Sequence, residues 1–245
     1  MRYGARMTIT PTILVVQNTP ESGPRRLGEW LTADGIRVDV AHPYRGDELP
    51  ERLDHDAIIV LGGDFMPDAD DRAPWLEATR RLVTEALSDA KPILGICLGG
   101  QLLAFVTGGS VRADAGAPEN GSTAIRVRAE AAEDPVFAGL DDVVPAIEHH
   151  IDAITRLPES AVWLAETDRC PYQAFRVGDN AWGVQFHPEV DASRIETWDP
   201  ARLRKYGLDR DELYQAALAA EPAAVVAWRG FATRFASVVR SSAAR

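Results

Sequence analysis

The stretch Lys91-Pro-Ile-Leu-Gly-Ile-Cys97-Leu-Gly-Gly-Gln101-Leu-Leu-Ala decides the fold, because a short apolar run enters Gly-x-Cys-x-Gly and then continues as helix. The run 93–96 predicts a buried strand, and the glycines on either side of Cys97 permit a tight strand-to-helix turn. Cys97 is therefore expected at the tip of this turn, above a sheet, where a helix N-terminus favours the thiolate. The alternative is that Cys97 is only a small buried hydrophobe at a tight turn.

A candidate base for this thiol follows in Ala181-Trp-Gly-Val-Gln-Phe-His187-Pro-Glu189-Val. A strand over 182–186 would deliver His187 at its carboxyl end, the edge where open α/β sheets hold their ligands. Pro188 cannot continue a strand ladder, so Glu189 can turn back toward the imidazole, fix its tautomer and stabilise imidazolium. A surface loop could carry His-Pro-Glu for no functional reason, but together with an elbow cysteine it indicates a Cys-His-Glu triad.

The rest of the chain alternates predicted strands and helices. On the amino side of the elbow, strands are expected at 12–16, 36–40, 57–61 and 93–96, with helices at 25–33 and 76–90. The first helix has Gly35 as a natural C-cap, and the second places Leu76, Val83, Leu87 and Ala90 on one face. This βαβα order predicts a mostly parallel sheet with helices on both faces. Further strands, expected to include antiparallel pairs, are predicted at 124–128, 161–165, 173–177 and 181–186.

The C-terminal part reads as helix beyond Val190. One helical face there carries four large apolar side chains, namely Trp228, Phe231, Phe235 and Val238. Such a stripe favours packing on the core, although it could instead dock a partner subunit.

No internal repeat or long linker divides the chain, so one domain is expected over 1–245. Its core is expected at about 10–200, followed by C-terminal helices at 201–245. Residues 1–8 show no periodicity and are expected to fray, with Met7 as an alternative start.

The composition is that of a globular protein, since 46% apolar and 26% charged residues suffice to build a buried sheet. A net charge of −11 without a basic patch argues against nucleic-acid binding. No apolar run approaches the roughly 20 residues that span a membrane, and no signal-peptide h-region is visible. We therefore expect no membrane association and a cytoplasmic location. Two cysteines cannot make a disulfide framework, and an unpaired Cys170 fits a reducing compartment.

No metal or cofactor is expected. His149 and His150 are adjacent while the other three histidines are scattered, so no Cys/His group has the spacing of a zinc site. The chain also lacks a GxxxxGK[ST] phosphate-binding loop.

The elbow Gly95-Ile-Cys97-Leu-Gly-Gly-Gln101 and the segment Gln185-Phe-His187-Pro-Glu189 together resemble the class I (triad) glutamine amidotransferases. The spacing of 187 − 97 = 90 residues between cysteine and histidine also fits, and the resemblance extends over about residues 10–200. Within this family, the chain resembles in particular a stand-alone member that is similar to the glutaminase of GMP synthase. The resemblance implies a three-layer, flavodoxin-like α/β sandwich with a mostly parallel central sheet, here with a C-terminal helical extension.

Leu61-Gly-Gly-Asp64, which follows a predicted strand, resembles the Gly-Gly turn of this family. The resemblance implies that the N–H groups of Gly63 and Leu98 form an oxyanion hole and that Gly62 borders the substrate. The family usually continues Gly-Gly-Pro, whereas this chain has Asp64 and reaches a proline only at position 67. The loop is therefore expected to differ in shape and in substrate fit.

Two further segments resemble substrate-contacting stretches of the family. Pro118-Glu-Asn-Gly121 is similar to a Glu-aromatic-Gly segment that contacts the α-amino and α-carboxylate groups of bound glutamine, with asparagine at the aromatic position. Glu148-His-His-Ile-Asp152 is similar to Ser-His-x-Asp, with His149 in place of the frequent serine. The resemblance implies substrate contacts by Gln101, Asn120, Gly121, His149 and His150. Alternatively, Gln101 faces solvent on its helix and the two histidines cap a loop.

The resemblance implies hydrolysis of the γ-amide of glutamine or of a γ-glutamyl compound through a thioester on Cys97. Glutamate is released together with ammonia or an amine. The chain is then either a free-standing hydrolase or the glutaminase subunit of a two-chain enzyme with a separate synthetase. Asp64, Asn120 and His149 are departures that could accommodate a larger leaving group. A catalytically silent glutamine-binding partner is a further alternative, as is a cysteine peptidase of similar topology, which would not explain Gln101.

Overall fold

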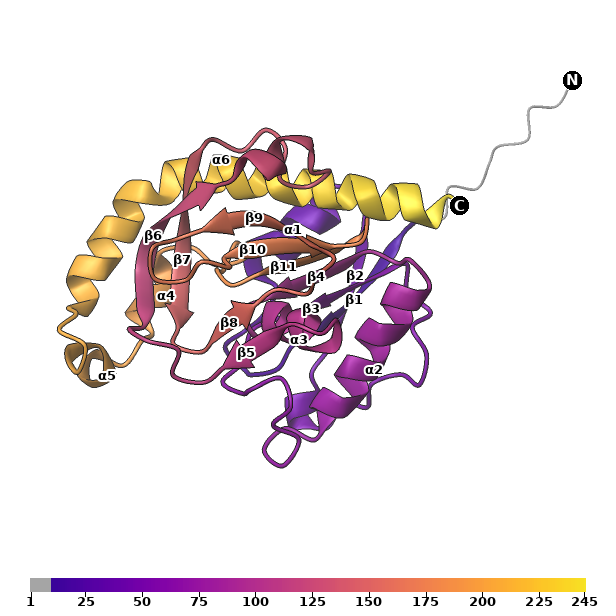
Figure 1. Cartoon of the computed structure of the whole chain (residues 1–245), viewed down its shortest axis with the longest axis horizontal. Coiled ribbons are helices and arrows are strands. Elements are labelled where there is room, and N and C mark those ends of the chain that lie inside the picture. Colours follow the sequence, from indigo (N-terminus) through magenta and orange to yellow (C-terminus); the bar gives the residue numbers. More distant parts are fainter. Residues whose placement is uncertain (1–9) are drawn as a thin grey trace, which may run out of the picture.

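The computed structural model describes residues 10–245, so the expectations for residues 1–8 and for Met7 lie outside the described part. A nine-stranded sheet in the order β2-β1-β3-β4-β11-β10-β9-β6-β7 forms the middle layer (Figure 1). Its strands are β1 (Thr12–Val16), β2 (Arg37–Ala41), β3 (Ala57–Val60), β4 (Ile93–Ile96), β6 (Glu119–Val127), β7 (Val143–His150), β9 (Ala161–Glu166), β10 (Ala174–Val177) and β11 (Ala181–Val184). A separate two-stranded sheet pairs β5 (Ser110–Arg112) with β8 (Ala153–Arg156).

Strand direction divides the large sheet into two parts. Strands β2, β1, β3, β4 and β11 are parallel, and β11, β10, β9, β6 and β7 pair in an antiparallel manner. The order 2-1-3-4 in the parallel part is that of flavodoxin-like sheets, as predicted. Because parallel strands end at the same edge, the residues that follow β3, β4 and β11 meet at one place.

Helices cover both faces of the sheet, which confirms the predicted three layers. The helices are α1 (Arg25–Ala33), α2 (Trp75–Ser88), α3 (Leu98–Val106), α4 (Ser193–Glu196), α5 (Pro200–Arg204) and α6 (Arg210–Ala243), with 3₁₀ turns at Pro43–Arg45 and Ala129–Glu133. Helices α1 and α6 pack over one face, and α2 and α3 pack over the other.

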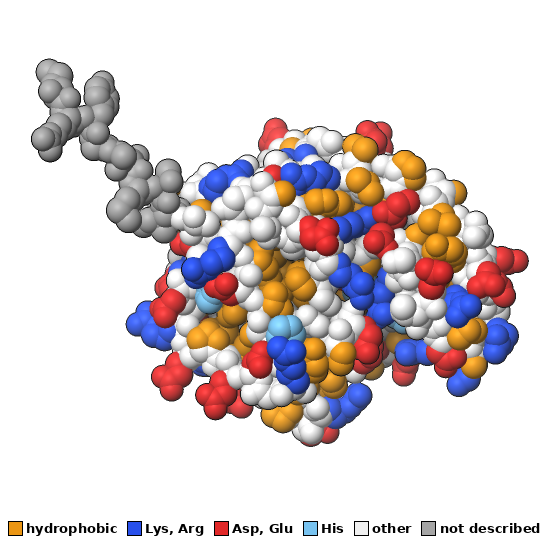
Figure 2. Space-filling view, turned by 180° about the vertical axis from the view of Figure 1, so that it is seen from behind, with side chains coloured by type: hydrophobic (Ala, Val, Ile, Leu, Met, Phe, Trp, Pro, Cys, Tyr) orange, Lys and Arg blue, Asp and Glu red, His pale blue; other side chains and the backbone are white. Residues whose placement is uncertain are grey.

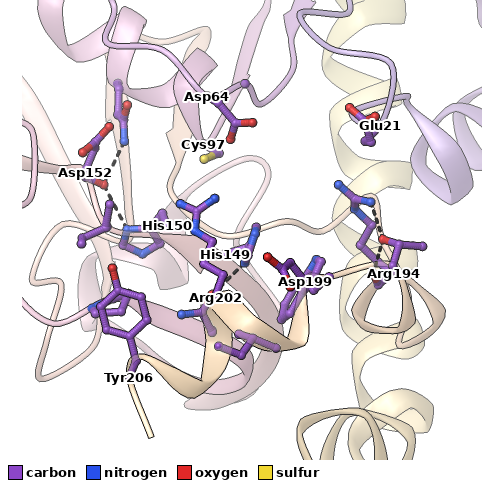
Figure 3. A pocket seen from close by; sticks show the side chains of 18 of the residues that line it. Glu21, Asp64, Cys97, His149, His150, Asp152, Arg194, Asp199, Arg202 and Tyr206 are labelled. Atoms are coloured by element: carbon purple, nitrogen blue, oxygen red, sulfur yellow. Dashed lines mark hydrogen bonds between the residues drawn. The ribbon is translucent and has the colours of Figure 1, made fainter. Parts of the chain in front are cut away.

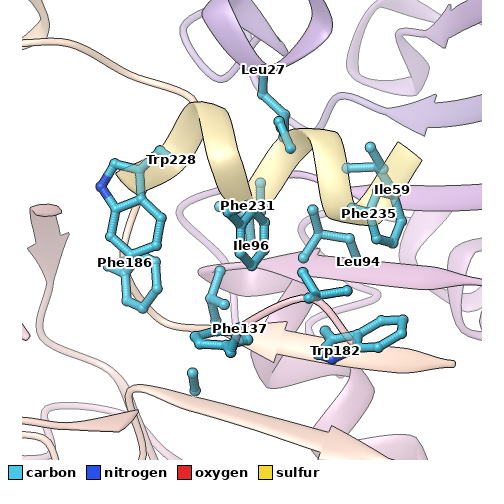
Figure 4. Packing of buried hydrophobic residues seen from close by; sticks show 14 of the residues in the cluster. Leu27, Ile59, Leu94, Ile96, Phe137, Trp182, Phe186, Trp228, Phe231 and Phe235 are labelled. Atoms are coloured by element: carbon cyan, nitrogen blue, oxygen red, sulfur yellow. The ribbon is translucent and has the colours of Figure 1, made fainter. Parts of the chain in front are cut away.

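The long C-terminal helix α6 packs on the core, as the apolar stripe favours. Trp228, Phe231 and Phe235 are completely buried, and Figure 4 shows them pointing from α6 toward the sheet. The face ends at fully buried Val239, whereas the predicted Val238 is only partly buried. The apolar stripe is therefore used within the chain, and the alternative of a docking face for a partner subunit is wrong for these aromatic residues.

Strand β11 is shorter than predicted, because it ends at Val184 instead of Phe186. Beyond this point, single backbone hydrogen bonds hold the chain. The Gln185 N–H donates to the Gln173 carbonyl at 2.8 Å, and the His187 N–H donates to the Ile147 carbonyl at 2.9 Å. His187 is therefore held by a backbone bridge to β7, beyond the end of its own strand.

The predicted apolar face of the second helix is partly wrong. Helix α2 buries Leu76, Leu82 and Val83, whereas Ala90 is exposed beyond its end. Ala90 has a φ of 52°, and the Lys91 N–H donates to the Ala86 carbonyl at 2.9 Å, so the chain turns there into β4.

The antiparallel part differs most from the sequence-based expectation. The strand predicted at 124–128 begins already at Glu119, and β7 was not predicted. In the register of β6 and β7, Asn120 lies opposite His149 and Glu119 lies opposite His150. The alternative in which the two histidines cap a loop is therefore wrong.

The surface carries charges of both signs. On the face drawn in Figure 2, acidic and basic side chains are interspersed, and neither sign gathers into a continuous patch. Among the helices of residues 10–245, none is sufficiently long and apolar to cross a membrane.

Candidate active site

Cys97 stands at the junction of β4 and α3, where the sequence places it. Its backbone has φ 51° and ψ −107°, a conformation that residues other than glycine rarely adopt and that costs on the order of 1–3 kcal/mol. The turn is held by a bond from the Cys97 N–H to the Val184 carbonyl at 2.8 Å. The first helical bond runs from the Gln101 N–H to the Cys97 carbonyl at 2.9 Å. Cys97 is 8% exposed, so the thiol lies almost entirely within the protein.

The glycines of the elbow let helix α3 begin directly against the sheet. A methyl group at Gly99 would overlap the Val60 carbonyl, and one at Gly100 would lie 2.6 Å from the Val184 carbonyl oxygen. No side chain can replace either hydrogen without moving α3 away from β3 and β11. The glycines therefore set the position of Cys97 relative to the neighbouring strands.

His187 and Glu189 form a close pair beside this cysteine. The His187 Nδ1 lies 2.7 Å from the Glu189 Oε1, and Glu189 is 1% exposed. Glu189 thus does turn back past Pro188 toward the imidazole. The side chains of His187 and Cys97 are within hydrogen-bonding reach. Burial by itself lowers the pKa of His187, but the Glu189 carboxylate and the bond with Cys97 outweigh it and raise the pKa well above its ordinary value.

The Gly-Gly turn after β3 lies against both reactive side chains. A Cβ at Gly62 would lie 3.0 Å from the His187 Cε1 and 3.5 Å from the Cys97 Cβ. A Cβ at Gly63 would lie 2.9 Å from the Leu98 Cδ2. Gly63 and Leu98 therefore lie side by side at the elbow, and their role as donors to an oxyanion stays a prediction.

Asn18, which the sequence analysis did not single out, holds this turn. Its Nδ2 donates to the Leu61 carbonyl at 2.8 Å, and its Oδ1 accepts from the Trp75 Nε1 at 3.0 Å. Asn18 is completely buried just beyond β1, and the only local signal is a polar residue after an apolar strand.

Two cavities open at Cys97, and Figure 3 shows the larger of them. The larger, of about 460 Å³, is lined by Gln101, Asn120, His149 and His150. The smaller, of about 170 Å³, is lined by Gly62, Gly63, His187 and Glu189. Residues beyond the predicted ones also line both cavities, namely Glu21, Asp64, Arg194, Trp198 and Arg202.

Gly121 is not among the residues that line either cavity. It has a φ of 95° in β6, and a Cβ there would lie 2.7 Å from the Leu213 Cδ2 of α6. Its surroundings point to packing against α6, and its predicted role at the substrate stays a prediction.

Gln101 is turned inward, so the alternative in which it faces solvent is wrong. The side chain is 3% exposed, and its Nε2 donates to the Asp152 carbonyl at 3.0 Å and to the Gln185 Oε1 at 3.3 Å. Its place on the first turn of α3 brings it to the wall of the larger cavity.

His149 is held between β6 and the segment that joins α4 to α5. Its Nδ1 lies 2.7 Å from the Asn120 Oδ1, and its ring stacks on Trp198 with centroids 4.2 Å apart. Burial, together with the charges of His187 and Arg202, lowers the pKa of His149 to about 3. His149 is therefore neutral at neutral pH and donates from Nδ1 to Asn120.

His150 lies between two buried carboxylates, those of Glu119 and Glu148. No local sequence pattern indicates that these three side chains meet. The His150 Nε2 is 3.2 Å from the Glu119 Oε2 and 3.3 Å from the Glu148 Oε2. Burial lowers the pKa of His150, but these two glutamates outweigh it and raise the pKa to about 10. Burial raises the pKa of Glu148, which is completely buried. His150 is therefore an imidazolium at neutral pH.

One group of potential metal ligands occurs in the described residues, formed by Glu119, His150 and Cys170, whose ligand atoms lie within 4.8 Å of one another. The charged His150 already pairs with the Glu119 carboxylate here, and burial raises the pKa of the Cys170 thiol. A protonated imidazole and a protonated thiol are poor metal ligands. The group is therefore explained as a buried ion pair.

The protein has relatives of known family. The family described as "Glutamine amidotransferase class-I" matches residues 26–198. The chain is 36% identical over 150 residues to the GMP synthase [glutamine-hydrolyzing] of Porphyromonas gingivalis, covering 61% of this chain and 28% of that protein. It is 40% identical over 111 residues to a protein of Methanopyrus kandleri named as one subunit of GMP synthase [glutamine-hydrolyzing], covering 45% of this chain and 58% of that protein. The chain thus spans about a quarter to three fifths of the length of these relatives.

Solved structures share the fold. A glutamine amidotransferase from Thermotoga maritima superposes with a TM-score of 0.82 at 24% identity, covering 93% of this chain and 99% of that one. Another from Methylobacillus flagellatus gives a TM-score of 0.81 at 23% identity, covering 96% and 95% of the two chains. The family match spans most of the chain and includes Cys97, His187 and Glu189. This protein belongs to the class I glutamine amidotransferase family.

Proposed function

We propose that this protein hydrolyses the γ-amide of glutamine, or of a larger γ-glutamyl compound, through a γ-glutamyl thioester on Cys97. The observation that carries the proposal is the arrangement of Cys97 on a strained turn, within reach of a histidine that buried Glu189 holds at 2.7 Å. A nucleophile, a base within its reach and a group that orients the base are the three parts of a hydrolase triad.

In the acylation step, the Cys97 sulfur attacks the γ-carbonyl carbon and forms a C–S bond. The N–H groups of Gly63 and Leu98 donate to the resulting oxyanion. The His187 imidazolium gives its proton to the leaving nitrogen, the C–N bond breaks, and ammonia or an amine departs. Glu189 stabilises the imidazolium beforehand without taking its proton.

In the deacylation step, neutral His187 takes a proton from water, and the oxygen attacks the thioester carbon. The C–S bond breaks, which regenerates the Cys97 thiolate beside the His187 imidazolium. The γ-carboxyl group of the product ionises, and glutamate leaves the site.

The larger cavity is proposed to hold the glutamyl part of the substrate. Gln101 uses its Nε2 in two bonds within the protein, and no described residue donates to its Oε1. This oxygen can therefore accept from a substrate N–H. Neutral His149, Asn120 and charged His150 line the same cavity and supply polar groups for the α-amino and α-carboxylate ends.

The smaller cavity supports a leaving group larger than ammonia. It contains His187, which must protonate the leaving nitrogen, so the amine departs on this side. Its volume of about 170 Å³ exceeds the roughly 10–15 Å³ that a water-sized molecule needs by more than tenfold. A γ-glutamyl amide with several heavy atoms in its amine part therefore fits this space.

The proposal is tested by measuring glutamate release by the purified chain from glutamine and from a set of γ-glutamyl peptides. Cys97→Ala is the blank. Turnover that depends on Cys97, with a glutamyl adduct on Cys97 in the intact mass spectrum, is expected. Equal or better turnover of free glutamine than of γ-glutamyl peptides would contradict the larger leaving group.

A second candidate function is that of a glutaminase subunit that works only with a separate synthetase chain. It is favoured by the relative from Methanopyrus kandleri, which is named a subunit of GMP synthase. Negligible turnover by the isolated chain, restored by adding a synthetase chain of such a relative, would support this candidate.

A catalytically silent glutamine-binding partner would bind glutamine without forming the Cys97 adduct. A cytoplasmic location stays a prediction.

A further inference from the structure

A continuous series of hydrogen bonds runs behind Cys97 through two buried glutamines. Gln185, which is completely buried, donates from its Nε2 to the Cys97 sulfur at 3.7 Å. Its Oε1 accepts from the Gln101 Nε2 at 3.3 Å. The Gln101 Nε2 also donates to the Asp152 carbonyl at 3.0 Å, and the same carbonyl accepts from the His150 Nδ1 at 3.0 Å.

The direction of these bonds is determined at the Asp152 end. A backbone carbonyl can only accept, so Gln101 must turn its NH₂ group toward Asp152. The second N–H of Gln101 then faces Gln185, which must present its oxygen. The NH₂ group of Gln185 is thereby left facing the Cys97 sulfur. A flipped Gln185 would set two NH₂ groups against each other and leave its oxygen facing a thiolate.

His150 keeps the far end of the series in a single protonation state. Its Nε2 lies between the carboxylates of Glu119 and Glu148, at 3.2 Å and 3.3 Å. An imidazolium carries a hydrogen on both ring nitrogens, so the Nδ1 is a permanent donor to the Asp152 carbonyl at neutral pH. Glu119 is itself held by Thr167 and Gln173, at 2.7 Å and 2.8 Å, so this end is anchored.

We propose that Gln185 donates a hydrogen bond to the Cys97 thiolate. Gln101 and His150 are positioning residues that keep this donor in place. The inference rests on the proposed function, because it takes Cys97 as the attacking sulfur. Gln185 is completely buried, so water cannot replace its N–H if the side chain is removed. The donor favours the thiolate over the thiol, so it supplies the nucleophile for acylation and stabilises the leaving group of deacylation.

The test follows alkylation of Cys97 by iodoacetamide in the full chain at pH 7, without substrate. Peptide mapping separates Cys97 from buried Cys170. Gln185→Leu removes the donor and the acceptor, whereas Gln185→Glu keeps an acceptor for Gln101 and, as a carboxylate, cannot donate to sulfur. Alkylation of Cys97 is expected to slow by about tenfold in both variants, the effect of losing one hydrogen bond to a charged group.

Two further variants sharpen the result. Gln101→Met leaves Gln185 in place but frees its amide to flip, so a smaller slowing of about two- to fivefold is expected. Gln215→Leu, on the exposed face of α6, is the matched control and should alkylate at the wild-type rate. Melting curves establish which variants are folded. If the leucine variant does not fold, the Gln185→Glu and Gln101→Met rates decide.

Cys97 alkylation within twofold of the wild-type rate in folded Gln185→Glu would overturn the inference. Because the assay uses no substrate, its outcome is separate from that of the proposed function. A chain that hydrolyses no glutamyl compound but shows Gln185-dependent alkylation would support the donor and contradict the activity. If Gln185→Glu keeps its turnover and its rate of Cys97 alkylation is unchanged, the activity is supported and the donor is contradicted.

Discussion

Trp198 stacks face to face on His149, with ring centroids 4.2 Å apart and an angle of 14° between the rings. The contact joins the segment between α4 and α5 to the end of β7, and it forms one wall of both cavities beside Cys97. Arg202 of α5, which belongs to the C-terminal extension, also lines both cavities, so the extension contributes to the site as well as covering the sheet. Neutral His149 is held in place by this stack and by Asn120.

Trp198→Ala is expected to raise the KM for a glutamyl substrate by about two- to tenfold, because the stack that orients His149 is lost. The kcat should change less, since Trp198 is not one of the three triad residues. Steady-state kinetics of glutamate release measure both. Trp163→Ala removes a tryptophan on β9 that does not line either cavity and should leave KM unchanged; an equal rise in both variants would contradict the role of Trp198.

Glu189→Gln should reduce kcat by about 10²- to 10⁴-fold, because an amide of the same size cannot stabilise the His187 imidazolium. The effect should grow with pH. Glu189 helps to raise the pKa of His187, so its removal lets the imidazolium deprotonate at lower pH. Activity of the variant is therefore expected to fall as pH rises through about 7, where the wild type is still protonated. Parallel pH profiles of the two proteins would contradict this role.

His150 should make the fold sensitive to alkali. Its folded pKa of about 10 lies above the ordinary 6.5, so its contribution to stability is complete below pH 6.5 and is lost as pH rises through 10. The free energy of unfolding, measured in urea at pH 7, 8.5 and 10, should fall along this series. His150→Gln should flatten the decrease, while His55→Gln, near the surface at Asp39, should keep the wild-type slope.

Phe231→Ala is expected to cost about 3–5 kcal/mol of the free energy of unfolding, because a completely buried aromatic ring leaves a cavity between α6 and the sheet. Val226→Ala, on the same helix but 76% exposed, should cost less than about 0.5 kcal/mol. Urea denaturation gives both values. Similar small losses in the two variants would mean that α6 adds little to the stability of the core.

The parts of the fold that the sequence predicts well are those with a local signal. β1, β4 and α1 have the predicted bounds, because an apolar run or a 3.6-residue period lies within each segment. The elbow glycines and the His-Pro-Glu order are likewise local. These residues determine the backbone geometry of their immediate neighbours. They thereby place Cys97 at the turn and bring Glu189 back to His187.

The sequence by itself thus determined the parallel half of the sheet, the nucleophile elbow and the pairing of His187 with Glu189. Only the tertiary structure decided how β7 pairs with β6, why His150 is charged, and that Gln101, Asp152 and Gln185 form one series of bonds behind Cys97. These contacts join residues 51 and 84 positions apart in the chain. A buried polar side chain has no periodic pattern to indicate its partner, because hydrogen bonds between distant segments depend on how the strands are ordered in space.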